Sequence, residues 1–253
     1  MSDLEQAARL LARAQRIAVL TGAGVSAESG VPTFRGAGGF WGKYRPEDLA
    51  TPEGFARDPN LVWNWYQARR RQLLQVQPNP AHYALARMER ELPARVTIIT
   101  QNIDGLHQRA GSKNVIAIHG DLMLTICTSC SFSRREEPPF EDGVPRCPNC
   151  GALLRPGVVW FGELLPEREL QQALEESHNC DVMLVVGTSA QVYPAAGFPS
   201  AARAAGAAVI EVNPDPALGG IARYVFAQPA GQALPPLVDA AVALASGGQH
   251  SPG

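Results

Sequence analysis

The sequence predicts an α/β fold, a Rossmann-like doubly wound parallel sheet that carries an inserted smaller domain. Short apolar runs of strand length alternate with helical stretches, as in a parallel sheet with helices on both faces. The first apolar run breaks directly into a glycine-rich turn. Two C-x2-C pairs interrupt the alternation further along the chain. We therefore expect the inserted domain to combine a helical module with a zinc ribbon.

Each element is predicted from its apolar pattern and from the residues that break it. Helices are expected over residues 2–15, 61–76, 81–91, 166–177, 194–205 and 233–245. Strands are expected over residues 17–20, 96–100, 115–118, 182–187, 207–212 and 224–226, which are short and largely apolar. Pro78 and Pro80 end the second helix. About 75 residues separate the first two strands, which indicates an insertion between them.

These elements predict a discontinuous chain organisation. The Rossmann-like domain would comprise residues 1–32, 77–120 and 156–253. Residues 33–76 would form a flap and a helical module, and residues 121–155 the zinc-ribbon module.

Composition limits the possible classes of protein. A chain of 253 residues can build one large domain with an insertion and needs no disulfide bonds to stabilise its core. The net charge of −2 provides no general attraction to nucleic acid or to an anionic membrane, so neither partner is expected. No signal sequence or apolar run of membrane-spanning length is visible, and we expect a cytoplasmic protein.

The glycine-rich turn follows the first predicted strand. Gly22, Ala23 and Gly24, with Ala27, form the pattern G-x-G-x-x-A, in which small residues let the backbone approach a pyrophosphate. Such a match alone is weak, because glycine after a strand often serves only a turn. No apolar strand ending in Asp or Glu follows about 20 residues on, where a dehydrogenase places its ribose-binding acid. Phosphate binding is therefore indicated, and hydride transfer is not.

Polar residues follow several predicted strands at their carboxyl ends, where open α/β sheets bind ligands. They are residues 101–107, His119, Thr188, Ser189 and Asn213. His119 is the best candidate for a general base near neutral pH, although a structural histidine is the commoner case for any one such residue. His107 is the rival candidate, but its place at a helix start favours capping or packing.

The cysteine spacing predicts a zinc ion. Cys127 and Cys130 form one pair, Cys147 and Cys150 form the other, and sixteen residues lie between the pairs. Two such pairs can place four thiolates at the corners of a tetrahedron, and reduced, unliganded cysteines would not explain two identical spacings. Four thiolates leave no open position for water, so we expect a structural ion. Cys180 stands apart and is expected in the core.

Several motifs together resemble one known family. GAGVSAESGVPTFR, TQNIDGLH, PGVVWFGE, VGTS and EVNP, with the paired cysteines, occur in the order found in sirtuins, the NAD-dependent protein lysine deacylases. The resemblance covers about residues 17–237. It implies that the protein removes acyl groups from lysine side chains of proteins or peptides with NAD, giving nicotinamide, O-acyl-ADP-ribose and free lysine. It also implies that neutral His119 is the general base.

The resemblance further implies a set of NAD-binding residues. The glycine loop would bind the pyrophosphate with Arg35, Asp104 would bond the nicotinamide carboxamide, and Ser189 and Asn213 would meet the adenosine side. The full implied set is Gly22, Ala23, Gly24, Ser26, Glu28, Phe34, Arg35, Trp41, Gln101, Asn102, Ile103, Asp104, Gly187, Thr188, Ser189, Asn213 and Ala230.

Substrate residues are implied in the same way. Val159, Phe161, Gly162 and Glu163 resemble the segment to which a substrate peptide adds as an extra strand. Tyr66 and Arg69 share a helix face, and Y-x-x-R in this helix of class III sirtuins recognises the carboxylate of succinyl- or malonyl-lysine. The plainer interpretation is that residues 69–71 form a solvated basic face. We expect a monomer.

Other functions remain open from the sequence. A zinc-ribbon nucleic-acid binder would need basic surface near the cysteines, where acidic residues balance Arg134, Arg135 and Arg146. Mono-ADP-ribosyl transfer, or NAD hydrolysis, could use the same pocket. A dehydrogenase is disfavoured by the missing ribose acid.

Overall fold

A computed structural model describes residues 1–32 and 45–247. Its large sheet has six parallel strands in the order β3-β2-β1-β7-β8-β9. The strands are β1 Arg16–Thr21, β2 Arg95–Thr100, β3 Val115–Ala117, β7 Val182–Val186, β8 Ala208–Val212 and β9 Tyr224–Phe226. The chain builds outward from β1 on one side and then returns to build outward from β7 on the other. Between β1 and β7 the strand order reverses, and ligands bind at the carboxyl ends of strands beside such a reversal.

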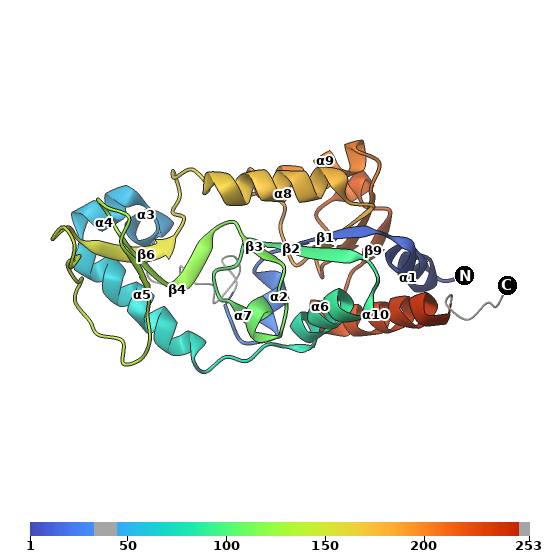
Figure 1. Ribbon diagram of the computed structural model, residues 1–253, viewed down its shortest axis with the longest axis horizontal. Helices are drawn as coiled ribbons and strands as arrows, with labels where there is room; N and C mark the ends of the chain where they lie inside the picture. The colour runs from blue at the N-terminus through green and yellow to red at the C-terminus, as the bar shows by residue number, and fades with distance from the viewer. Residues whose placement is uncertain (33–44, 248–253) are drawn as a thin grey trace.

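Helices cover both faces of this sheet (Figure 1). On one face α1 Asp3–Arg13, α6 Pro80–Glu91 and α10 Ala230–Gly247 pack against Ile17 and Val19 of β1. On the other face α8 Glu167–Asn179 and α9 Phe198–Ala204 pack against Ala18 and Leu20. Alternate residues of β1 are therefore buried on opposite faces, which explains why the whole strand is apolar.

A smaller domain lies at the end of the molecule opposite to the chain termini (Figure 1). Its antiparallel sheet has the order β5-β4-β6, with β4 Gly120–Cys127, β5 Ser133–Arg135 and β6 Leu154–Val158. The helices α3 Pro46–Leu49, α4 Pro52–Arg57 and α5 Pro59–Leu73 belong to the same end. A third apolar cluster, which includes Leu49, Phe55, Val62 and Trp160, joins these helices to β4 and β6.

Short elements complete the chain. They are α2 Gly24–Ala27, α7 Leu106–Arg109 and two 3-10 turns, η1 Ala195–Gly197 and η2 Gly219–Ile221. Among the described residues, no helix has both the length and the apolar character needed to cross a bilayer.

The predicted fold class, with its six parallel strands, is confirmed. The helices α3 and α4 and the strand β4 were not predicted, and α10 begins three residues earlier than expected. Strand β6 crosses the proposed domain limit between residues 155 and 156, because it pairs with β4 in the small sheet. The proposed domain limits stay a prediction.

Candidate active site and zinc site

The glycine turn joins β1 to α2 through a very close backbone contact. The amide of Gly24 donates to the carbonyl oxygen of Gly187 at 2.8 Å, and the amide of Gly22 donates to that of Val186 at 3.1 Å. A Cβ atom on Gly24 would lie 2.7 Å from the Cα atom of Gly187. Only glycine fits here, and Ala23 and Gly24 remain partly exposed. The turn thus has the small residues that close approach to a dinucleotide phosphate requires.

Ser26, Asn102 and Asp104 meet beneath this turn. The hydroxyl of Ser26 donates to Oδ2 of Asp104 at 2.8 Å. The side-chain nitrogen Nδ2 of Asn102 donates to Ser26 Oγ and to the Gly22 carbonyl oxygen, each at 3.1 Å. Desolvation by burial raises the pKa of Asp104, which remains bonded to Ser26 and to the amide of Leu106. Residues almost 80 positions apart in sequence therefore form one polar group at the edge of the sheet.

A buried histidine, His82, supports this group from α6. Its Nδ1 accepts the amide of Asn79 at 3.2 Å, so the proton of a neutral ring is on Nε2, 3.3 Å from Ser26 Oγ. Nε2–H then donates to Ser26, whose own proton goes to Asp104. His82 is not among the predicted site residues, although its place three residues after Asn79, the N-cap of α6, is a recognisable capping signal.

The rival histidine, His107, lies in α7 and is buried, as the packing interpretation predicted. Its Nε2 is 3.0 Å from Thr21 Oγ1, and Thr21 donates its proton to Thr100 at 2.8 Å. Nε2 of His107 must therefore be the donor. The ring centroids of His107 and His82 are 4.9 Å apart.

His119 follows β3 at the carboxyl edge of the sheet and is half-buried. Its Nδ1 lies 2.9 Å from the carbonyl oxygen of Gln101, which can only accept, so Nδ1 carries the proton and Nε2 keeps a lone pair. Burial lowers the pKa of His119, and the bond to Gln101 opposes this effect. A neutral imidazole with an oriented basic nitrogen results.

The ends of β2, β7 and β8 meet through side chains predicted to bind the cofactor. Gln101 donates to Thr188 Oγ1 at 2.9 Å, and Asn213 donates to the Thr188 carbonyl at 3.0 Å. The backbone amide of Gly187 donates to the carbonyl oxygen of Val212 at 2.9 Å. Ser189 is exposed beside them, and Ile103 is half-buried.

Glu28, which follows α2, and Ala230, in α10, are two other residues of the predicted cofactor set, and they meet at the start of α10. A carboxylate oxygen of Glu28 accepts the amide of Gly231 at 2.6 Å. Ala230, the first residue of the helix, is buried. Phe34, Arg35 and Trp41 lie outside the described residues.

The predicted substrate segment follows β6. The amide of Val159 donates to the carbonyl of His119 at 2.9 Å, which places the segment beside the candidate base. Phe161 is 53% exposed, and Gly162 has a positive φ of 88°. The carboxylate of Glu163 accepts the amide of Trp160 at 2.8 Å and the guanidinium of Arg155, so it faces inward.

The tyrosine and arginine of the Y-x-x-R motif lie in α5. Tyr66 is buried, and its oxygen accepts the indole N–H of Trp160 at 3.0 Å. The guanidinium carbon of Arg69 lies 3.5 Å from the ring centroid of Trp65, and burial lowers the pKa of Arg69 to about 9. The plainer interpretation of a solvated basic face is wrong for Arg70, which is fully buried.

The four paired cysteines converge as predicted. Their sulfur atoms all lie within 4.8 Å of one another, with Cys127 and Cys150 at 3.5 Å and Cys130 and Cys147 at 3.6 Å. A tetrahedral zinc–thiolate site with bonds of about 2.3 Å has sulfur–sulfur edges of about 3.8 Å. The sulfur positions therefore fit one zinc ion with no open position. Cys180 is buried in the core, apart from this group.

Comparison with known proteins identifies close relatives. The chain is 49% identical over 243 residues to a Pyrococcus furiosus protein named NAD-dependent protein deacylase, covering 93% of this chain and 97% of that one. It is also 49% identical over 239 residues to NAD-dependent protein deacylase 1 of Pseudomonas aeruginosa, with 90% and 95% covered.

Solved structures agree with these relatives. A Sir2 homolog–NAD complex matches with a TM-score of 0.91 and 47% identity, covering 95% of this chain and 94% of that one. A Sir2 complex with a deacetylated p53 peptide and 3'-O-acetyl-ADP-ribose matches at 0.83 and 33% identity, with 94% and 98% covered. The family model described as the Sir2 family matches residues 22–194. With most of its length matched by that model, the chain belongs to the Sir2 family, the sirtuins.

Proposed function

We propose that the protein removes acyl groups from lysine side chains of proteins or peptides in an NAD-dependent reaction that yields nicotinamide, O-acyl-ADP-ribose and free lysine. One observation carries this proposal. His119, with a basic Nε2, lies at the same sheet edge as the glycine turn and the Ser26–Asp104 group. The relatives that are 49% identical to this chain are named NAD-dependent protein deacylases.

NAD, when bound, supplies an electrophilic ribose carbon and a pyridine leaving group. Gly22, Ala23 and Gly24 would hold its pyrophosphate, because no side chain there blocks the backbone. Asn102, Ile103 and Asp104 would line the nicotinamide pocket. On the adenosine side we propose Ser189, Asn213 and their neighbours in the predicted set. Phe34, Arg35 and Trp41 stay predictions of that set.

We assign His119 the role of general base for a ribose hydroxyl. The carbonyl of Gln101 fixes the proton on Nδ1, so Nε2 can accept one. Burial lowers the pKa of His119, which favours the neutral imidazole that can accept a proton. Val159 donates its amide to the carbonyl of His119, so the proposed peptide segment and the base are fixed relative to each other. A substrate strand added there would present its acyl-lysine near Nε2.

We further propose that Tyr66 and Arg69 recognise a terminal carboxylate, so that succinyl and malonyl groups are removed alongside acetyl groups. The oxygen of Tyr66 accepts from Trp160, which directs the phenolic proton away from Trp160. The partly desolvated guanidinium of Arg69 lies one helical turn further along the same face. A phenol donor beside a cation suits a carboxylate.

The test is mass spectrometry of the products formed from NAD with acetyl- and succinyl-peptides. His119→Ala should lower kcat about a hundredfold or more, while zinc content and folding are retained. Arg69→Met should lower the ratio of kcat/KM for the succinyl peptide to kcat/KM for the acetyl peptide. The decrease should correspond to a loss of about 2 to 4 kcal/mol of transition-state stabilisation. Arg71→Met on the same helix is the matched control, since Arg71 pairs with Asp142 at the surface.

Three results would contradict these proposals. Undiminished turnover by folded, zinc-loaded His119→Ala would exclude the base role. An unchanged acyl preference in Arg69→Met would exclude the carboxylate role. Nicotinamide release with ADP-ribose transferred to protein, and no loss of acyl groups, would favour mono-ADP-ribosyl transfer instead. A monomeric state, a cytoplasmic location and the absence of nucleic-acid or membrane partners stay predictions from the sequence.

A further inference from the structure

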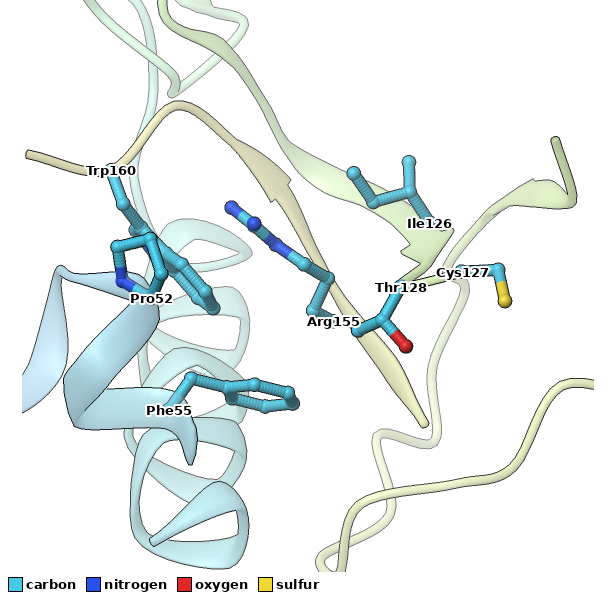
Figure 2. Close-up of a pocket in the computed structure, with 7 residues that line it drawn as sticks. All are labelled: Pro52, Phe55, Ile126, Cys127, Thr128, Arg155 and Trp160. Carbon is cyan, nitrogen blue, oxygen red and sulfur yellow. The ribbon is translucent and has the colours of Figure 1, made fainter. Parts of the chain in front are cut away.

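Arg155 of β6 lies beside Trp160, with its side chain extended toward the indole ring (Figure 2). Its NH2 nitrogen donates to the carboxylate of Glu163 and to the carbonyl of Val158, each at 2.9 Å, and NH1 donates to the second oxygen of Glu163. Its guanidinium carbon also lies 3.4 Å from the ring centroid of Trp160. Only 12% of the side chain is exposed.

The pairing with Glu163 closes the turn that carries the substrate segment. Arg155 and Val158 lie before this turn, and Glu163 lies at its end. Glu163 also accepts the amide of Trp160 inside the turn, at 2.8 Å. Two parallel hydrogen bonds from a guanidinium restrain a carboxylate in orientation as well as in distance. The backbone between residues 158 and 163 is therefore held in one shape before a peptide arrives.

Trp160, on which Arg155 stacks, contacts Tyr66 of the proposed acyl site. The indole N–H of Trp160 donates to the oxygen of Tyr66, so the ring position determines where the phenolic proton points. Trp160 is 2% exposed, and its other ring neighbour is Phe55, with centroids 5.3 Å apart.

A cavity of about 300 Å³ opens beside this contact, and Figure 2 shows Arg155 and Trp160 in its wall. Its remaining lining includes Pro52, Phe55 and Ile126. The cavity is partly open to the protein surface, and a side chain that lines it can move into this space. The indole would therefore have room to tilt if the guanidinium were removed. Phe55 and Tyr66 pack against part of the indole ring, and the stacked guanidinium of Arg155 holds another part.

We propose that Arg155 is a positioning residue that orders the peptide-binding segment through Glu163 and orients Tyr66 through Trp160. This inference rests on the proposed function. One side chain then affects both peptide affinity and acyl preference, although it lies in the small sheet and is expected to touch neither NAD nor the reacting atoms.

The test compares steady-state kinetics of Arg155→Met, Arg155→Lys and Glu163→Gln with wild type, using acetyl- and succinyl-peptides. Arg155→Met should raise KM for both peptides about tenfold while KM for NAD stays within about twofold. It should also lower the succinyl-to-acetyl ratio of kcat/KM about fivefold or more. Glu163→Gln should raise the peptide KM without changing that ratio, because the stack on Trp160 remains. Arg155→Lys should fall between wild type and Arg155→Met.

The control is Arg134→Met, which removes an ion pair with Glu136 from the same small sheet and should change none of these constants. Zinc content and the melting temperature are measured for every variant. If Arg155→Met does not fold, unchanged peptide KM values in both Arg155→Lys and Glu163→Gln overturn the inference. Equal rises in KM for NAD and for peptide also overturn it, since they indicate general damage.

The outcomes separate this inference from the proposed function. A wild type that removes neither acyl group with NAD overturns the proposed function and the inference with it. A wild type active on acetyl peptides alone overturns the part that concerns Tyr66. An active wild type with unchanged variants overturns the inference and leaves the proposed function intact.

Discussion

Two buried imidazoles should make the protein less stable in mild acid. His82 and His107 are almost fully buried, with 0% and 1% of their surface exposed. Burial lowers the pKa of His82 from 6.5 to about 4, and burial together with the charge of His82 lowers that of His107 to about 3. The unfolded chain, with ordinary imidazoles, therefore binds more protons than the folded protein between about pH 4 and pH 6.5. Stability rises with pH in this window and is lost as the pH falls through it.

The magnitude depends little on how low the folded pKa values are. A pH of 5 is about 1.5 units below the pKa of an imidazole in the unfolded chain, and each unit corresponds to about 1.4 kcal/mol. Each histidine therefore lowers the free energy of unfolding by about 2 kcal/mol between pH 7 and pH 5. Together they cost about 4 kcal/mol, a large part of the typical stability of a domain of this kind.

The assay is urea unfolding at pH 7, 6 and 5, followed by circular dichroism at constant zinc concentration. His82→Gln should lose about 2 kcal/mol less than wild type between pH 7 and pH 5. Glutamine suits this position because it can complete the capping box with Asn79. Thiolate protonation also weakens the zinc site in acid, but it does so equally in both proteins. His178→Gln, at an exposed position of α8, is the control. Equal losses in wild type and His82→Gln would refute the reasoning.

Three further predictions concern the glycine turn, the small sheet and the metal. Gly24→Ala should raise KM for NAD about tenfold, measured by steady-state kinetics, because its Cβ would lie 2.7 Å from Gly187 and separate the two loops; an unchanged KM would contradict this close contact. Arg70→Met should lower the free energy of unfolding by about 3 kcal/mol in urea, since it leaves the Leu122 and Leu124 carbonyls without their donor; a change below about 1 kcal/mol would contradict it. Zinc chelation should make residues 121–155 sensitive to trypsin and stop turnover, both reversed by added zinc; full activity of the metal-free protein would show that the small sheet folds without the ion.

The sequence was sufficient for the large sheet because buried parallel strands are apolar on both faces. Runs such as residues 17–20 and 182–187 have the length and apolar character of a buried strand, and their alternation with helical stretches favours a strand over a buried helix segment. Strand β4 escaped prediction for the opposite reason. Its residues are buried or partly buried without a regular alternation, and its pairing with β6 shifts register between Gly120 and Thr125.

The site was predictable only as separate pieces. His119 and Asp104 could be selected because each follows a strand at the edge that binds ligands. The bond from Ser26 to Asp104 spans 78 residues, and His82 reaches Ser26 across 56. Such contacts depend on how α2 and α6 pack at the edge of the sheet, and no local pattern records that packing.

The three consecutive arginines of α5 show why a charge run is a poor guide to environment. Successive residues on a helix point about 100° apart, so neighbours face different surroundings. Arg69 stacks on Trp65, Arg70 is buried and bonded to β4, and Arg71 pairs with Asp142. The buried bonds of Arg70 fasten α5 to β4, whereas the pair between Arg71 and Asp142 lies at the surface and contributes little. Arg69 therefore keeps its direction through the bonds of Arg70, and carboxylate preference should be sensitive to Arg70 as well as to Arg69 itself.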